Sequence, residues 1–424
     1  MGRANKSTWV YAYLPQGISG GATSTLILLF AYALGGNLVN VGIIAAATSI
    51  ASVPAFMLWG GLSDRFELRK PFLLIGFVGS GVALVAMAAS RTMSEFYIAN
   101  LLAGCLGAAS GPAGTVLLME TSDRKDWPGR LAFVSRITAA GWTLGLAFAA
   151  SWLAVNGGFM GGPLSSMRAL FLVGAGMSFF AGLIVLIAAP MTSRHLDRTS
   201  VTVADSNLRV ERGRYLPLRV MNFVGPQDVG HLRMPKSFRV FLACVFLWFA
   251  GFTAFYSFFP IFLTQVYGLG SSQIFAIYIA SQVASIAVYP RVADWVSARG
   301  SGTMQVYGSL GRSVLFGSFF ILGLTGIHDL ARLGLVVGLH AGVGVCWAVI
   351  NVAGSTLASR LAPKARRARA FGAFNAVQGF GSILGPLAGG FAAGFLGYGW
   401  AFATSVGLVV AGSAVLWAAR IRDA

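Results

Sequence analysis

Two arginines interrupt apolar stretches of this chain that carry almost no other charge. Arg136 falls shortly after the start of the stretch 131–155, and Arg312 lies near the middle of 303–326. An arginine at the centre of a membrane-spanning helix costs roughly 2.5–3.5 kcal/mol on insertion scales, so such a residue usually has a partner or a function. Both arginines are therefore candidates for a functional site.

Acidic side chains are missing from the same stretches. Every Asp and Glu can be assigned to a loop, a tail or the end of an apolar stretch. A buried carboxylate with a raised pKa is a common device for moving a proton inside a membrane, and this chain lacks it in its obvious form. His340 is a well-placed titratable substitute, because an unperturbed imidazole has a pKa of about 6.5. Proton coupling and a neutral hydrogen-bonding function are both open for His340.

Polar side chains recur at helical spacing in three stretches and mark helix faces that avoid lipid. These candidates are His340, Trp347 and Asn351 in the stretch 331–354, Tyr278 and Gln282 in 272–290, and Asn375 and Gln378 in 370–395. The stretch 239–266 is aromatic on all sides, and Trp248 and Tyr256 are its better candidates for solute contact because each ring has a polar group. The competing interpretation is that these side chains form hydrogen bonds between packed helices.

Two further candidates lie nearer the N-terminus. Gln16 shares a helix face with small residues beside a potential kink at Pro15. Asn100 begins a glycine-rich groove, which indicates close helix packing more than chemistry.

The elements that must position these residues are membrane-spanning helices. The 424-residue chain is 56% hydrophobic and 10% charged and contains 55 glycines, whereas a soluble domain has about 25% charged residues. Glycine is common where membrane helices approach closely. Twelve apolar runs are each long enough to cross a bilayer: 9–34, 40–60, 71–90, 96–119, 131–155, 167–189, 239–266, 272–290, 303–326, 331–354, 370–395 and 399–419.

Basic residues orient these spans. Most Lys and Arg residues lie in the tails and in the connections after the even-numbered runs, whereas the opposite loops hold only Arg91, Arg168 and Arg332. Because basic loops stay in the cytoplasm, we expect both termini to be cytoplasmic and the protein to be a multi-pass protein of the plasma membrane. The same loops account for the net charge of +18, so no nucleic-acid partner is expected.

A long hydrophilic stretch divides the chain into two halves. Residues 1–190 and 239–424 each hold six apolar runs, and the basic linker 191–238 joins them. We expect this linker to lie against anionic lipid headgroups. The hinge after the second run, "GGLSDRFELRK", is matched 230 residues later by a hinge that contains Asp294 and Arg299. Matching hinges in matching places predict duplicated six-helix halves.

The first hinge could form a breakable polar lock, with its aspartate facing the N-terminus of a neighbouring helix. It resembles the loop between the second and third spans of the major facilitator superfamily, and Glu120 followed by Arg130 is similar to that family's loop between spans four and five. The matching hinge residues are Gly60, Asp64, Arg65, Arg69 and Lys70, with Glu67 where the family usually has glycine.

The resemblance implies an all-α membrane protein with twelve transmembrane helices in two pseudo-symmetric six-helix bundles around a central cavity. It implies that Arg136 reaches either the cavity or Glu120, and both interpretations are open. Arg312 would lie in the ninth span, a peripheral helix in the family, and we favour a structural or snorkelling function for it. The stretch "GSILGPLAGG" (381–390) resembles a glycine motif of span five in antiporters, but span five here has Gly141 and Gly145 without the proline.

Three functions are open from the sequence. The first is a secondary transporter of a small organic solute by alternating access, with an anionic or neutral amphipathic solute favoured over a cation. Multidrug or lipid efflux by antiport is the second, and a non-transporting membrane sensor is the third. We expect no enzyme activity, no cofactor and no metal, since nucleophile–base pairs, metal clusters and phosphate loops are not found. A coupling ion is possible, and the family implies a monomer.

Overall fold

The computed structural model describes residues 8–66, 68–122, 126–156, 162–191, 234–325, 329–362, 367–419 and 421. These residues are helical or lie in short connections, and they include no β-strand. Most of the predicted linker, residues 192–233, lies outside the described residues.

Helices of the first half follow the predicted spans, with the fourth span divided between two helices. The elements are η1 (Thr8–Ala12, a 3₁₀ helix), α1 (Tyr13–Ala33), α2 (Leu38–Phe66), α3 (Lys70–Ala89), α4 (Met93–Gly107), α5 (Ser110–Glu120), α6 (Trp127–Asn156) and α7 (Pro163–Ala188).

Helices of the second half again follow the predicted spans, and the eleventh ends in a short π-helix. The elements are α11 (Lys236–Gln265), α12 (Ser271–Arg299), α13 (Ser301–Gly323), α14 (Asp329–Leu361), α15 (Arg367–Phe391), η5 (Ala392–Leu396, the π-helix) and α16 (Tyr398–Ala418).

Eleven segments of the described chain are long and apolar enough to cross a membrane, with α4 and α5 together forming one of them, Met93–Glu120. Helix α1 is not in that set, and its 21 residues include Gln16, Ser19 and Thr23. Its length of 21 residues corresponds to about 30 Å of helix, enough to span a hydrocarbon core. The predicted all-α membrane fold is confirmed.

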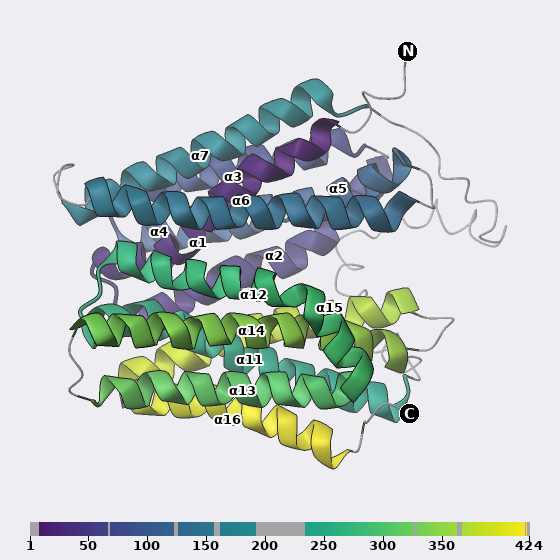
Figure 1. Cartoon of the computed structure of the whole chain (residues 1–424). Helices are drawn as coiled ribbons and strands as arrows, with labels where there is room; N and C mark the ends of the chain where they lie inside the picture. The colour runs from purple at the N-terminus through teal and green to yellow at the C-terminus, as the bar shows by residue number, and fades with distance from the viewer. Residues whose placement is uncertain are drawn as a thin grey trace.

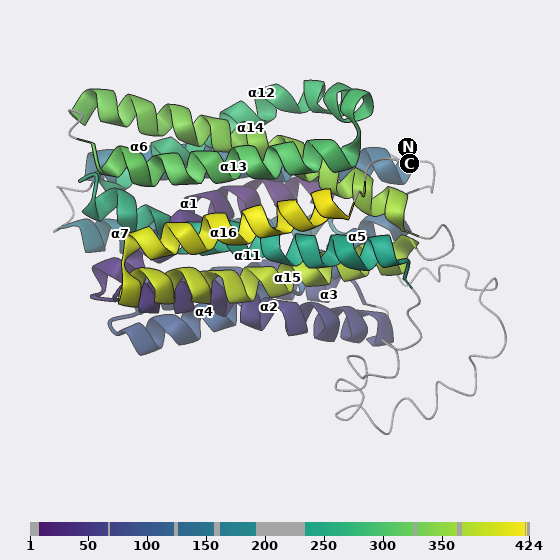
Figure 2. The same ribbon diagram turned by 90° about the horizontal axis from the view of Figure 1, so that it is seen from below.

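The two halves repeat the same helix packing (Figures 1 and 2). In the first half, α1 packs on α6, α2 on α4, and α3 on α7. The equivalent pairs of the second half are α11 with α15, α12 with α14, and α13 with α16. Consecutive spans run in opposite directions, so the molecule has two ends. We call the end where α2 meets α3 and α12 meets α13 the hinge end, and the opposite end the distal end (Figure 1).

Glycines set the closest packing within each half. A Cβ atom at Gly145 of α6 would lie 2.1 Å from the carbonyl oxygen of Ile18 in α1. A Cβ atom at Gly385 of α15 would lie 2.3 Å from the carbonyl oxygen of Ala250 in α11. The glycine stripes of spans five and eleven therefore serve equivalent backbone contacts, as small residues do between membrane helices.

Contact between the halves involves α2 with α15 and α6 with α12, two pairs that the repeat makes equivalent. The closest approach lies toward the distal end. A Cβ atom at Gly390 would lie 2.6 Å from the Cα atom of Gly42, and one at Gly42 would lie 2.7 Å from the carbonyl oxygen of Pro386. Because both neighbours are backbone atoms, neither can move aside without separating the helices.

We predict that Gly390→Ala lowers the stability of the described conformation by roughly 1–3 kcal/mol, the usual cost of forcing extra volume into a packed site. Thermal unfolding in detergent measures the effect. Gly407→Ala in α16 is the matched control, because a Cβ atom there would meet nothing within 4 Å. The control should be neutral or stabilising by up to about 1 kcal/mol, since alanine is the better helix former. Equal melting temperatures for the two variants would contradict the prediction.

Candidate functional site

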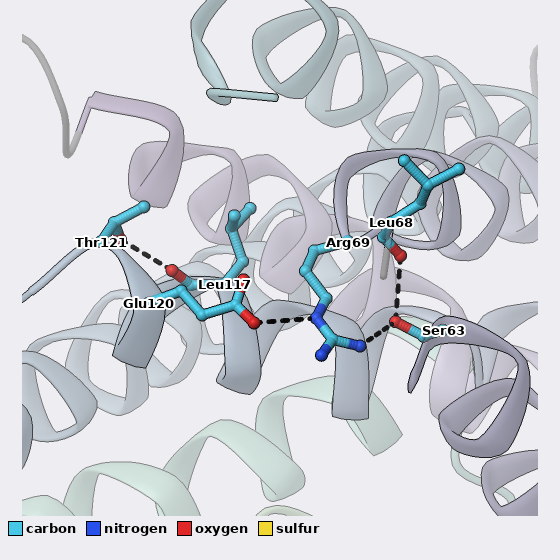
Figure 3. A network of polar contacts seen from close by, with 6 residues as sticks. All are labelled: Ser63, Leu68, Arg69, Leu117, Glu120 and Thr121. Atoms are coloured by element: carbon cyan, nitrogen blue, oxygen red, sulfur yellow. Dashed lines mark hydrogen bonds and ion pairs between the residues drawn. The ribbon is translucent and has the colours of Figure 1, made fainter. Parts of the chain in front are cut away.

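A buried polar cluster ties three elements together at the hinge end (Figure 3). Arg69, in the connection between α2 and α3, donates from Nε to Glu120 Oε1 at 3.1 Å and from Nη1 to Ser63 Oγ at 2.9 Å. Ser63 in turn donates to the carbonyl oxygen of Leu68 at 3.0 Å. The side chains of Arg69 and Glu120 are only 8% and 7% exposed. The cluster therefore joins the last turn of α5 to the hinge through a largely desolvated ion pair.

The other hinge residues have less confined positions. Arg65 is exposed, while Lys70 and Arg130 are partly buried. The side chain of Asp64 lies outside the described residues. A Cβ atom at Gly60 would lie in ordinary contact with Pro112, 3.7 Å from its Cβ, so this glycine is not required for a close helix approach here.

The second hinge does not reproduce the environment of the first. Asp294 and Arg299, at the end of α12, are both exposed. The sequence repeat therefore preserves the positions of these residues without preserving the buried cluster.

A second polar contact closes the distal end. Gln265 at the end of α11 donates from Nε2 to the Tyr32 hydroxyl of α1 at 2.7 Å, and the Tyr398 hydroxyl of α16 donates to Gln265 Oε1. The bond from Gln265 to Tyr32 joins the two halves. Sequence analysis did not single out these residues, because a polar residue at a helix end is common in any membrane protein.

Arg312 has the most unusual surroundings in the described chain. It is 3% exposed, and its Cζ atom lies 4.4 Å from the ring centroid of Phe252, 5.0 Å from Trp347, and 5.4 Å from both Tyr256 and Phe316. Its Nη2 donates to the Tyr256 hydroxyl at 3.1 Å. Neither Nε nor Nη1 has a hydrogen-bond partner among the described residues. We call Arg312 and these four rings the arginine cage.

Of the two functions that the sequence favoured for Arg312, structural or snorkelling, the structure bears on the second. A snorkelling side chain would extend toward water, whereas this guanidinium points inward between α11 and α14. A structural function for Arg312 stays a prediction, because the sequence could not show which side of its helix Arg312 occupies. Tyr256 and Trp347, both predicted candidates, lie beside the guanidinium, but helix packing brings them to α13 and the sequence does not show this contact.

His340 lies next to the arginine cage. It is 1% exposed, its ring stacks on Phe259 with centroids 5.5 Å apart, and the Tyr278 ring lies 4.9 Å away. Its Nδ1 is 3.0 Å from the carbonyl oxygen of Ile277. Because a carbonyl oxygen only accepts, Nδ1 carries a proton. Nε2 is buried without a partner in the described residues and is therefore the atom that could take up a proton.

The remaining polar candidates fall into two groups. Asn351 is exposed and donates to the Tyr289 hydroxyl at 2.9 Å, Asn375 is exposed, and Gln282 and Gln378 are partly buried. These four belong to α12, α14 and α15 and form no compact cluster with the arginine cage in the contacts described. Their function as cavity residues stays a prediction.

The second group comprises the buried Trp248 and Asn100 and the partly buried Gln16, whereas Arg136 is exposed. Trp248 is 1% exposed and donates from Nε1 to Ser413 Oγ of α16 at 3.0 Å, and Asn100 donates to the Phe96 carbonyl of its own helix at 2.8 Å. Gln16 is partly buried, with Oε1 unpartnered in the described chain. Arg136 is exposed on α6. Glu120 pairs with Arg69, and no ion pair joins it to Arg136 within the described residues.

Metal binding finds no support in the described part of the chain, which contains no group of three or more His, Cys, Asp or Glu side chains that could hold an ion.

Comparison with known proteins identifies the family. The model of the Major Facilitator Superfamily matches residues 10–351 and 309–424. The chain therefore belongs to the Major Facilitator Superfamily, as the first hinge predicted, and its family and fold are those of transporters. It is a multi-pass membrane protein.

Two relatives match part of the chain. Multidrug resistance protein 2 of Bacillus subtilis (strain 168) is 25% identical over 251 residues, which are 59% of this chain and 56% of that protein. Tetracycline resistance protein, class B, of Escherichia coli is 25% identical over 200 residues, 46% of each chain. The chain thus spans about half the length of the relatives it matches.

Solved structures match nearly the whole fold. A mutant of the nucleoside transporter NupG has a TM-score of 0.75 at 16% identity, covering 97% of this chain and 98% of that one. A bacterial homologue of the human lysosomal transporter Spinster, inward-facing and unoccupied, has a TM-score of 0.71 at 12% identity, covering 98% and 97%. The inward-open xylose transporter XylE of E. coli scores 0.68 at 17% identity, covering 96% and 95%. At these identities the likeness concerns the fold alone.

We predict that Glu120→Ala destabilises the protein by about 3–5 kcal/mol, because it removes one partner of a buried ion pair. Unfolding in mixed micelles measures the loss. Asp294→Ala is the matched control, since this exposed carboxylate lies in the hinge of the other half. Its effect should stay within about 0.5 kcal/mol, as for most surface substitutions. Comparable losses for both variants would contradict a special function of the buried cluster.

Proposed function

We propose that this protein is a secondary active transporter that moves a small organic solute by alternating access. The solute is anionic or neutral and amphipathic. The protein acts as a monomer in the plasma membrane, with both termini cytoplasmic, and a coupling ion accompanies the solute. The family supports transport in general. The monomer rests on the family resemblance and the orientation on the basic loops, whereas alternating access and the solute class rest on the arrangement of the two halves and on the polar groups of the interior.

The observation that carries the proposal is the difference between the two ends of the molecule. At the distal end, Gly42 meets Gly390 and Tyr32 bonds to Gln265 across the halves. Toward the hinge end, Phe56, Met57 and Leu58 of α2 are 47%, 52% and 44% exposed. Three successive helical residues face directions spread over about 200°, so protein covers this part of α2 incompletely, although the Phe56 ring lies close to Gly111 of α5.

Exposed polar residues extend this difference to the other half. Asn351 of α14 and Asn375 of α15 are exposed. Halves that touch at the distal end and are less packed toward the hinge end have the form expected for one state of an alternating-access cycle. The buried pair of Arg69 and Glu120 would then hold the first hinge rigid while the halves rock.

Multidrug or lipid efflux is the second candidate. Two relatives are named for multidrug and tetracycline resistance, and α11 is rich in aromatic residues. Competition experiments separate the candidates: broad inhibition by unrelated hydrophobic compounds favours efflux, whereas inhibition by a single chemical class favours the proposed transporter.

The distal contact offers a direct test of alternating access. The Cβ atom of Val39 lies 3.7 Å from the Cβ position of Gly394 in the other half, within the 3.5–4.5 Å range of disulfides. We predict that oxidising a Val39→Cys/Gly394→Cys variant stops counterflow in proteoliposomes and that dithiothreitol restores it, because the cross-link prevents the distal end from opening. The probes are 1-naphthoate, uridine, xylose and tetracycline.

The two single-cysteine variants, treated with the same oxidant, control for other oxidation. Undiminished counterflow in a fully cross-linked protein would contradict alternating access through the distal end. Counterflow of none of the four probes in the reduced protein would favour the sensor interpretation.

His340 gives a separate prediction about coupling. If Nε2 carries the coupled proton, uptake driven by a pH gradient should be lost in His340→Gln, whereas counterflow without a gradient should persist. The glutamine keeps a side-chain donor for the Ile277 carbonyl but cannot take up a proton near neutral pH. Gradient-driven uptake that survives the substitution would remove His340 from the coupling mechanism.

A further inference from the structure

We propose that the arginine cage binds the negative group of the transported solute and that this solute is a small organic monoanion with a flat apolar body. The inference rests on the proposed function, since it names the solute class for the interior of the same transporter. It assigns anion selection to Arg312, which lies inside the second half, and not to the exposed Arg136.

The charge of Arg312 is the first reason. Among the described residues no carboxylate forms an ion pair with it, and the one described acidic side chain of the second half, Asp294, is exposed at the end of α12. Withdrawing a cation from water costs several kcal/mol. A desolvated cation–π contact returns about 2 kcal/mol or more, so the four rings offset part of this cost, but neither the rings nor the Tyr256 phenol carries a negative charge. The cage therefore leaves positive charge for an anion to neutralise.

The unpartnered donors are the second reason. Nε and Nη1 of Arg312 have no acceptor in the described chain, although the residue is only 3% exposed. Buried polar groups are hydrogen-bonded in the large majority of cases. A carboxylate would supply acceptors to these donors, and guanidinium is well suited to that group because of its planar array of N–H bonds.

The surrounding rings indicate the rest of the solute. Four ring faces or edges lie within 4.4–5.4 Å of the guanidinium carbon, and the Tyr256 and Trp347 rings are partly exposed. Flat apolar groups stack well on such rings. One guanidinium balances one negative charge, and neighbouring His340 has its proton on Nδ1 committed to the Ile277 carbonyl. The cage therefore suits one negative charge on an aromatic or similarly flat body.

Three probes with one aromatic body separate charge from shape: 1-naphthoate, 1-naphthalenemethanol and 1-naphthylmethylammonium. Calorimetry and thermal stabilisation of the full chain in detergent measure their binding, since a ligand that binds the folded state raises its melting temperature. We expect 1-naphthoate to bind at least tenfold more tightly than the alcohol or the ammonium compound. Arg312→Gln should weaken 1-naphthoate at least tenfold and leave the alcohol unchanged.

Arg291→Gln is the matched control, because Arg291 is an exposed arginine of α12; it should leave all three affinities unchanged. Arg312→Lys should weaken 1-naphthoate less than the glutamine variant, since it keeps the charge and loses the planar donors. If Arg312→Gln does not fold, two other single variants provide the test. Arg312→Lys should weaken 1-naphthoate selectively, whereas Trp347→Leu should weaken 1-naphthoate and the alcohol alike, because both carry the naphthyl ring.

Equal affinity for the acid and the alcohol, preference for the ammonium compound, or unchanged 1-naphthoate binding in folded Arg312 variants would each overturn the inference and leave Arg312 a structural cation. Binding of none of the three probes would also overturn it. Failure here is distinguishable from failure of the proposed function, because the distal cross-link reports on transport of uridine, xylose or tetracycline independently of any anion site.

Discussion

Removing a cation from water is costly in free energy, and this protein offsets the cost in two different ways. At the hinge end, Arg69 is surrounded by protein and paired with Glu120, with Ser63 as a further acceptor. In the second half, Arg312 is equally buried but has rings and one phenol around it. The first solution is complete within the chain and suits a structural joint. The second leaves donors unsatisfied and suits a site that an external group completes.

Backbone proximity provides the rigidity that both sites need. Glycines of α6 and α15 allow α1 and α11 to approach to backbone contact, so each half is held by packing that bulkier residues would prevent. Between the halves the same kind of contact is found near the distal end, where Gly42 meets Gly390. Strong packing within the halves and localised packing between them is the combination that rigid-body rocking requires.

Much of this architecture follows from sequence patterns with a simple physical basis. Apolar runs of about 20 residues correspond to spans because a bilayer admits few other structures, and the first hinge identified the family. The environment of the second hinge did not follow from that of the first. Asp294 and Arg299 repeat the spacing of the first hinge yet are exposed, because a repeat in sequence says nothing about which neighbouring helix covers it.

The sequence by itself determined the helices, their order, the duplicated halves and the exclusion of acids from the membrane interior, since all of these depend on local composition and on spacing along one helix. Only the tertiary structure decided which partners the arginines have. Glu120 stands 51 residues from Arg69 and Tyr256 stands 56 residues from Arg312. Such pairs are chosen by how whole helices pack, so a guanidinium assigned to a peripheral helix could point into the interior, beside His340.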